Sequence, residues 1–140
     1  HDPVKQVIGA CHAGWRGTAL GIAAGTARKM AEVYGTDPAD LHCAIGPGIS
    51  RCCFETRADV PEAMRAALGG AAEDFIDDHG GGSFHVDLKG INRWWLHSAG
   101  VPLEQIEVCE ACTACDLNTF FSHRRMGAAR GAMAAIIELT

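Results

Sequence analysis

The sequence predicts a mixed α/β fold (α/β or α+β), with layered mixed sheets and flanking helices in a single domain. Short apolar runs alternate with longer segments whose apolar residues recur at helical spacing, as in folds that alternate strands and helices. A chain of 140 residues, 48% of them apolar, can bury a core of its own. We therefore expect residues 1–140 to form one domain.

The first third of the chain predicts two strands and one long helix. We predict a buried strand over Val4–Cys11, which ends in the apolar run Val7–Cys11. Gly17–Tyr34 has helical spacing, with Gly35 as its stop. Asp37-Pro38 can cap and begin one short turn of helix. Leu41–Ile45 is then a second short strand, which ends at a Gly-Pro-Gly turn.

The middle of the chain predicts two helices and one strand. Asp59–Leu68 and Leu88–Ala99 have helical spacing, and Asp87 can cap the second helix. Phe84–Val86 is a brief strand between them. Residues 71–83 have no useful period and contain three consecutive glycines, so we expect a mobile loop there, with at most one turn of helix.

The last third of the chain predicts three short strands. Gly100 ends the preceding helix, and Ile106–Cys109 is the first strand after it. Phe120–Ser122 is a candidate second strand. Ala132–Leu139 is an apolar run that we interpret as a final strand, although its alanines also permit a helix.

Charge and cysteine content exclude several classes of protein. A net charge of −5 and a pI near 5.7 argue against a general nucleic-acid surface. No apolar run is long enough to span a membrane. Seven cysteines, an odd number that includes the adjacent pair Cys52-Cys53, argue against a disulfide framework. With no signal peptide in the sequence, we expect reduced thiols and a cytoplasmic protein.

The sequence opens on polar residues that lead straight into the first predicted strand. We therefore expect an N-terminally incomplete domain, whose first strand lacks its sequence-adjacent neighbours. Expressed alone, such a fragment would expose a sheet edge or an apolar face and would associate. The sequence leaves the oligomeric state open.

An active-site corner is predicted at the HAGWRG segment, His12–Gly17. His12 follows an apolar run, and the two glycines allow the backbone to turn tightly or approach a ligand closely. Histidine is a common metal ligand and titrates near pH 7, while the arginine fork of Arg16 suits oxyanions. We therefore predict that His12 and Arg16 are catalytic residues. The alternative for His12 is a core histidine that bonds the backbone.

Two further segments predict anion binding. The amides of the Gly-Pro-Gly turn, together with Arg51, could cradle an anion. The alternative is an ordinary tight turn, with Cys52-Cys53 as small buried apolar side chains. Phe120–Arg125 combines aromatic side chains with Arg124 and a second arginine, which suggests an anion site with a stacking surface. The alternative there is a solvated basic turn.

The run Cys109-x-x-Cys112-x-x-Cys115 has the spacing of a metal-binding motif. A closed site needs four ligands, and no second cysteine pair stands at the spacing of a zinc finger. A fourth thiolate would have to be brought in by the fold, from Cys43, Cys52 or Cys53. We therefore expect these three cysteines to hold no metal and the seven thiols to form no disulfide.

Four segments in order resemble the YfiH-like, or laccase-domain, family. They cover most of the chain: HAGWRG at 12–17, AIGPGISRCCFE at 44–55, VDLKGINRWWLHSAGV at 86–101 and CTACDLNTFFSHRR at 112–125. The resemblance implies one α/β domain with layered sheets, related to a cytotoxic-factor hydrolase fold. It also implies a zinc ion held by two histidines and one cysteine, with His12 as one ligand. The family's other two ligands lie upstream of the HAGWRG segment, so the resemblance implies that they precede His1.

The resemblance implies a purine nucleoside phosphorylase that also deaminates adenosine and cleaves methylthioadenosine. Its partners would be a small nucleoside and phosphate. From the chemistry of the guanidinium group, and not from the resemblance, we predict Arg16, Arg51 and Arg124 as phosphate ligands. Residues 1–140 alone are expected to be inactive, because they hold one of the three zinc ligands. The alternatives are a copper-dependent polyphenol oxidase (laccase) and a non-catalytic nucleotide-binding module.

Overall fold

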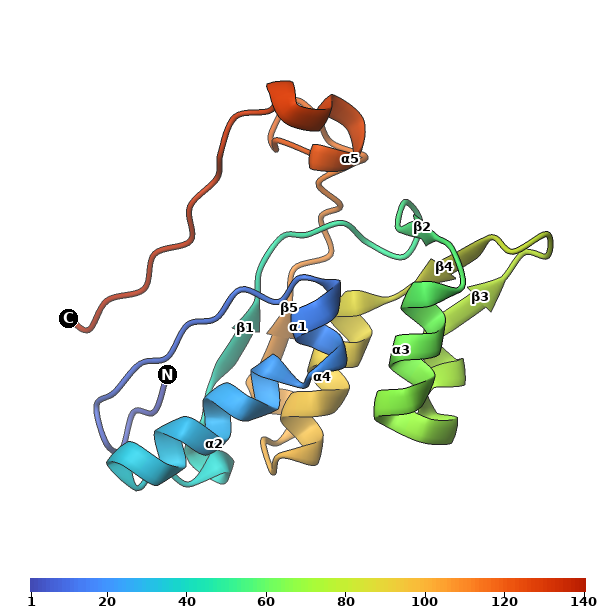
Figure 1. Ribbon diagram of the computed structural model, residues 1–140. Coiled ribbons are helices and arrows are strands. Elements are labelled where there is room, and N and C mark those ends of the chain that lie inside the picture. Colours follow the sequence, from blue (N-terminus) through green and yellow to red (C-terminus); the bar gives the residue numbers. More distant parts are fainter. The chain divides into compact units, whose positions relative to one another are not determined.

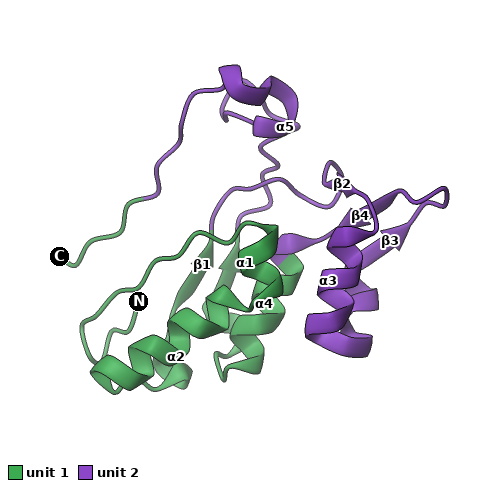
Figure 2. Cartoon of the chain, viewed as in Figure 1, with its two compact units in different colours: residues 1–45, 90–108, 136–140 green, residues 46–89, 109–135 purple.

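The computed structural model describes residues 1–140 and divides them into two compact units (Figure 2). Unit 1 comprises residues 1–45, 90–108 and 136–140, and unit 2 comprises residues 46–89 and 109–135. The division does not test whether residues 1–140 form one domain, so the single domain stays a prediction.

Unit 1 is built from helices and a two-stranded parallel sheet. Its elements are α1 (Trp15–Ala19), α2 (Ile22–Tyr34), β1 (Cys43–Ile45), β5 (Ile106–Val108) and most of α4 (Leu88–Ser98) (Figure 1). Strands β1 and β5 run parallel and pair Cys43 with Ile106 and Ile45 with Val108. Two single 3₁₀ turns, Pro38–Asp40 and Leu103–Gln105, precede these two strands.

The core of unit 1 forms where the apolar stripe of α2 meets the end of α4 and the sheet. Its buried residues come from α2, from α4 and the turn after it, and from the strands or the residues beside them: Ala23, Ala27, Met30, Leu41, Leu96, Val101 and Ile106. The three α2 residues in this list recur every three or four positions, which places them on one helical face. Burial of this face fixes α2 against α4 within the unit.

Unit 2 contains a three-stranded antiparallel sheet and one long helix. Its elements are β2 (Glu55–Thr56), α3 (Asp59–Leu68), the 3₁₀ segment Gly69–Phe75, β3 (Ile76–Asp78), β4 (Phe84–Val86) and α5 (His123–Met126). The strand order is β2-β4-β3, and β4 pairs Val86 with Ile76 and His85 with Glu55. Met64 of α3, Ala72 and Val86 are fully buried.

The mixed α/β class with parallel and antiparallel sheets and flanking helices is confirmed. Several predicted elements also agree in their bounds. Helix α3 and strand β4 match the predicted ranges residue for residue, and α4 ends one residue before the predicted Ala99. Gly35 ends α2 with a left-handed backbone, and the Asp37 side chain accepts a hydrogen bond from the N–H of Ala39 to cap the short turn.

The predicted buried strand Val4–Cys11 is wrong. The Asp2 carboxylate accepts hydrogen bonds from the N–H groups of Val4 and Lys5, and the backbone bonds between Asp2 and Val7 close a turn there. Val4 is exposed, and the segment from residue 8 to 14 has no strand partner. A β-branched run forms a strand only when another backbone pairs with it, and none does so in this structure.

Four other predictions also differ from the structure. The single helix Gly17–Tyr34 is two helices, because Gly21 adopts a left-handed backbone with φ of 67° between α1 and α2. Within the predicted loop 71–83, residues 71–78 belong to the 3₁₀ segment Gly69–Phe75 and to β3, and only residues 79–83 form a turn. Phe120–Ser122 and Ala132–Leu139 form no strand, because no neighbouring backbone pairs with them.

Candidate functional site

His12 lies on the surface of unit 1, in the irregular segment that leads into α1. Gly14 is the N-cap of α1, with ordinary extended φ and ψ angles of −68° and 169°. A Cβ atom at Gly14 would lie 3.2 Å from Nε2 of His12, so the glycine makes room for the imidazole beside the helix start. The prediction of His12 at a strand end is wrong, but an exposed imidazole at a glycine-rich corner is what the structure contains.

Arg16 lies in the first turn of α1 and packs on its neighbour. Its guanidinium carbon is 4.2 Å from the ring centroid of Trp15, within the range of a cation–π contact. The side chain is exposed, and no carboxylate pairs with it. The indole therefore orients a guanidinium whose hydrogen-bond donors remain available to an anion.

Helix α1 is anchored through Thr18, which is fully buried. Nδ2 of Asn92 donates to Oγ1 of Thr18 over 2.9 Å, and Nε1 of Trp95 donates to the Thr18 carbonyl over 2.9 Å. The Thr18 hydroxyl donates in turn to the carbonyl of Ala13 over 3.4 Å. Two side chains of α4 thus fix the corner that carries His12. No local pattern in the sequence predicts this support, because its contacts join residues 74 and 77 positions apart.

Arg51 is engaged within unit 2. Its Nε donates to Oδ2 of Asp77 over 2.6 Å, its Nη2 pairs with Oδ1 of the same carboxylate, and its Nη1 donates to the Asp74 carbonyl over 3.2 Å. The hydrogen bonds from Arg51 hold the pKa of the Asp77 carboxyl below its ordinary value. A phosphate at Arg51 would therefore have to compete with a bidentate carboxylate.

Lys89 is a buried cation that no motif in the sequence predicts. Its Nζ donates to Oγ of Ser50 over 2.9 Å and to the carbonyls of Cys109 and Ala111 over 2.7 and 2.8 Å. Three donors and three acceptors satisfy the ammonium group. Lys89 thereby joins the turn after β1 to the segment after β5, both within unit 2.

Arg124 and Arg125 of α5 donate hydrogen bonds to backbone carbonyls elsewhere in unit 2. Nη1 of Arg124 donates to the carbonyls of Cys53 and Glu55 over 3.3 and 2.8 Å, and its guanidinium lies 5.4 Å from the ring centroid of Phe54. Arg125 donates from Nε to the Ala114 carbonyl over 3.1 Å. The two arginines thus tie the C-terminal segment of the unit to residues 53–55 and 114.

A pocket of about 230 Å³ adjoins Arg124 in unit 2. It is lined by apolar, hydroxyl and basic side chains: Ile49, Phe54, Thr113, Ser122, His123 and Arg124. Phe54 and Arg124 both line this pocket, whereas Phe120 and Phe121 do not, and the predicted anion site with a stacking surface stays a prediction. The role of Arg124 in phosphate binding stays a prediction.

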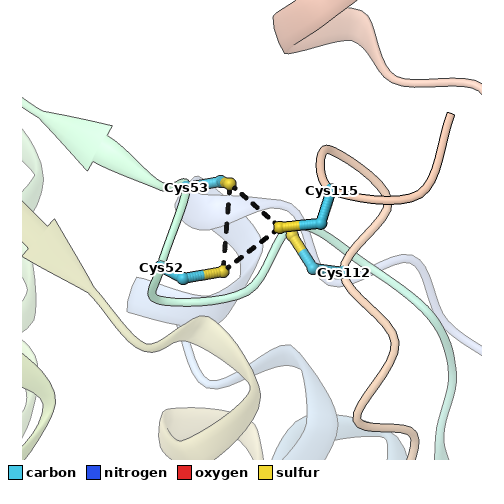
Figure 3. Close-up of side chains that lie close together, drawn as sticks. All are labelled: Cys52, Cys53, Cys112 and Cys115. Carbon is cyan, nitrogen blue, oxygen red and sulfur yellow. Dashed lines mark hydrogen bonds between the residues drawn. The ribbon is translucent and has the colours of Figure 1, made fainter.

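Four cysteines converge in unit 2, and their sulfur atoms all lie within 4.8 Å of one another (Figure 3). We call Cys52, Cys53, Cys112 and Cys115 the four-cysteine cluster. Cys52 and Cys115 are exposed and Cys53 is half-buried, so the interpretation of Cys52-Cys53 as buried apolar side chains is wrong. Cys109 stays outside the cluster, and all seven cysteines are free thiols.

Hydrogen bonds shift the pKa values of two cysteines of the cluster in opposite directions. Burial raises the pKa of the Cys112 thiol, but hydrogen bonds from the backbone N–H groups of Ser50, Ala114 and Cys115 outweigh burial and lower that pKa to about 6. Hydrogen bonds with the thiols of Cys53 and Cys52 raise the pKa of Cys115 to about 12. One sulfur of the cluster therefore favours the thiolate form, while another keeps its proton.

Comparison with known proteins shows similarity along the whole chain. Residues 1–140 match the family model described as multi-copper polyphenol oxidoreductase laccase. The chain is 36% identical over 139 residues to the purine nucleoside phosphorylase YlmD of Bacillus subtilis, which covers 99% of this chain and 50% of that protein. It is 34% identical over 126 residues to the adenosine deaminase RL5 of an unknown prokaryotic organism, covering 90% of this chain and 48% of that protein.

Solved structures of proteins similar in sequence have the same fold as this chain. The crystal structure of the hypothetical protein YfiH of Bacillus licheniformis superposes with a TM-score of 0.86 at 40% identity, covering 89% of this chain and 47% of that one. YlmD of Geobacillus stearothermophilus superposes with a TM-score of 0.77 at 40% identity, covering 82% of this chain and 43% of that one. The chain spans about half the length of the curated relatives described above. None of its helices has the length and apolar character that crossing a membrane requires.

Proposed function

The chain belongs to the multi-copper polyphenol oxidoreductase laccase family, and on that premise we propose that it is part of an enzyme that cleaves purine nucleosides by phosphorolysis. The relatives named purine nucleoside phosphorylase support this proposal. Adenosine, inosine, guanosine and methylthioadenosine are the proposed substrates. The motif-based resemblance to the YfiH-like family is confirmed by the same comparisons.

The observation that carries the proposal is that His12 and Arg16 are both exposed, four positions apart, in the segment that is anchored through Thr18. Arg16 has a guanidinium that is oriented by Trp15 and unpaired with any carboxylate. A planar guanidinium binds phosphate through two parallel hydrogen bonds. We assign the first anion-binding role to Arg16 because the donors of Arg51 are already bonded to Asp77 and Asp74.

Phosphorolysis needs an oriented anion more than it needs a strong base. A phosphate oxygen forms a bond to the anomeric carbon of the ribose while the bond from that carbon to the purine nitrogen breaks, giving a ribose 1-phosphate and the free purine. Positive charge develops on the sugar in the transition state, so an anion held in line stabilises it. Arg16 would hold that phosphate through its fork of donors.

Zinc at His12 would require ligands from outside residues 1–140. His12 is exposed and can offer one nitrogen, but no group of three metal-ligating side chains forms around it. Residues 1–140 therefore do not make the implied zinc site by themselves. We propose His12 as the ligand that this part of the polypeptide contributes.

Adenosine deamination is the second candidate function. One relative is named an adenosine deaminase, at 34% identity. The metal-ligating side chains of residues 1–140 support a copper-dependent phenol oxidase less than they support the two nucleoside activities. Copper oxidase sites are rich in histidine, whereas the one group of metal-ligating side chains in residues 1–140 is made of cysteines.

A product assay on the full polypeptide tests the proposal. Inosine is supplied with and without inorganic phosphate, and hypoxanthine and ribose 1-phosphate are quantified by chromatography. We expect both products in equal amounts, and only with phosphate. Ammonia release from adenosine without phosphate would identify the deaminase. Hypoxanthine formed equally without phosphate, or no cleavage of any of the four nucleosides, would overturn the proposal.

A further inference from the structure

We propose that the four-cysteine cluster of Cys52, Cys53, Cys112 and Cys115 binds one zinc ion through four sulfur atoms, as a structural site. The site is separate from the zinc proposed at His12 and does not depend on the proposed function. It replaces the expectation that the cysteine run holds no metal. That expectation rested on a missing fourth ligand, and the fold supplies two thiols from residues 52 and 53.

The spacing of the sulfur atoms fits a single ion. Sγ of Cys52 lies 3.8 Å from that of Cys53 and 3.7 Å from that of Cys115, and Sγ of Cys53 lies 3.4 Å from that of Cys115. Zinc binds thiolates at about 2.3 Å, and a regular tetrahedron around such an ion has edges of about 3.8 Å. The sulfurs converge from two separate loops, as Figure 3 shows. The sulfur of Cys112 lies within 4.8 Å of the other three, so a modest side-chain movement completes the tetrahedron.

The surroundings of the cluster suit a negatively charged centre. Zinc with four thiolates carries a net charge of −2, which needs donors and cations nearby. The N–H of Ser50 donates to Sγ of Cys112 over 3.3 Å, and Nη2 of Arg125 lies 3.8 Å from Sγ of Cys53. Such contacts are the outer-shell partners that thiolate sites use. Arg124 adds a second guanidinium on the Cys53 carbonyl.

The chemistry of four thiolates indicates a structural role. Four protein ligands fill the tetrahedron, so no position remains open for water or substrate. The cluster joins the loop after β1 to the loop after β5, which also pair at Gly48 and Cys112. Few strands or helices hold these loops, and Cys52 and Cys115 are too exposed to contribute much by burial. An ion there would fix the loop that carries Arg51.

Metal content of the full polypeptide, purified with reductant, tests the site. We compare the unchanged protein with Cys115→Ser and with Cys109→Ser, a matched control because Cys109 belongs to the same run but lies outside the cluster. Cys115→Ser should lose one equivalent of zinc by elemental analysis, and Cys109→Ser should lose none. His12→Ala should keep the cluster's zinc, so failure at His12 and failure at the cluster are distinguishable.

Cobalt substitution gives a readout that does not require any of the four cysteines to be changed. Co²⁺ bound to the unchanged protein should show the visible bands of a tetrahedral ion and strong sulfur-to-cobalt charge transfer, and four thiols should resist alkylation until the metal is removed. The same bands in His12→Ala assign them to the cluster. The proposal is overturned if the unchanged protein shows no thiolate charge transfer, if Cys115→Ser keeps all of its zinc, or if mass spectrometry finds a Cys53–Cys115 disulfide in place of the metal.

Discussion

Asn92 of α4 donates a hydrogen bond from Nδ2 to Oγ1 of Thr18 of α1 over 2.9 Å, and both side chains are buried. The bond connects two segments of sequence that carry separate family motifs. Because α1 is only five residues long, it has little stability of its own. The geometry of the His12 corner therefore depends on α4. Substitutions of the α4 residues that bond Thr18 should alter the position of His12 although they do not contact it.

Replacing Thr18 by valine should destabilise the protein. The substitution keeps the shape of the side chain but removes the buried hydroxyl that accepts from Nδ2 of Asn92 and donates to the Ala13 carbonyl, which costs about 1–3 kcal/mol in the free energy of unfolding. Urea denaturation of the full polypeptide measures the change. Thr26→Val is the control, because the Thr26 hydroxyl bonds only the carbonyl of Ile22 in its own helix at an exposed position. Equal losses in the two variants would contradict the prediction.

Substitutions at His12 and Arg16 should separate metal loss from substrate loss. His12→Ala should lower zinc content and nucleoside cleavage together while the fold survives, because an exposed side chain contributes little to the core. Arg16→Lys keeps the charge but loses the planar fork, so the KM for phosphate should rise with zinc retained. Arg28→Lys on α2, also exposed, is the matched control. Full zinc and normal turnover in His12→Ala would show that this corner is not catalytic.

Gly14→Ala should displace the His12 ring without unfolding the chain. The backbone at Gly14 suits any residue, but the added methyl would lie 3.2 Å from Nε2 of His12, closer than most side-chain contacts allow. Zinc affinity and turnover should fall, while the unfolding midpoint in urea stays within experimental error. Gly25→Ala is the control, since its nearest neighbour would be 3.9 Å away. Unchanged turnover in Gly14→Ala would indicate that the position of the His12 ring does not matter.

The Arg51–Asp77 pair should make the free energy of unfolding fall as the pH is lowered into the acid range. The pKa of Asp77 is lower in the folded state than the ordinary value of 3.8, so its contribution is present above pH 3.8 and is lost as the pH falls through the folded pKa. Asp77→Asn should remove that dependence, as seen in urea unfolding between neutral pH and pH 3. Asp74→Asn is the control, because Arg51 uses only the carbonyl of Asp74. An identical pH profile in Asp77→Asn and the unchanged protein would refute the role of the pair.

Elements with strong local signals were predictable from the sequence. Helix α3 has a helical apolar stripe and a glycine after its last residue, and its bounds match the prediction. The capped turn at Asp37 also depends only on neighbouring residues. Such signals act within a few residues, so they are present in the sequence whatever the rest of the chain does.

The segment Val4–Cys11 and the break at Gly21 show where local reasoning stops. A strand requires a second backbone, and no pattern inside Val4–Cys11 reports whether one is available. Gly21 lies inside a continuous helical pattern. Its backbone is left-handed, and a Cβ atom at this position would lie 3.3 Å from the ring of Trp95, a residue 74 positions away. The resulting split of one predicted helix into α1 and α2 is a tertiary effect.

The sequence by itself determined the family, the mixed α/β class and the His12–Arg16 motif, because each of these is carried by residues adjacent in the chain. Only the tertiary structure decided that Thr18 anchors α1, that Arg51 is bonded to Asp77, and that Cys52 and Cys53 join Cys112 and Cys115 while Cys109 does not. Each of these contacts joins residues at least 26 positions apart, and such distances are set by the packing of the whole chain.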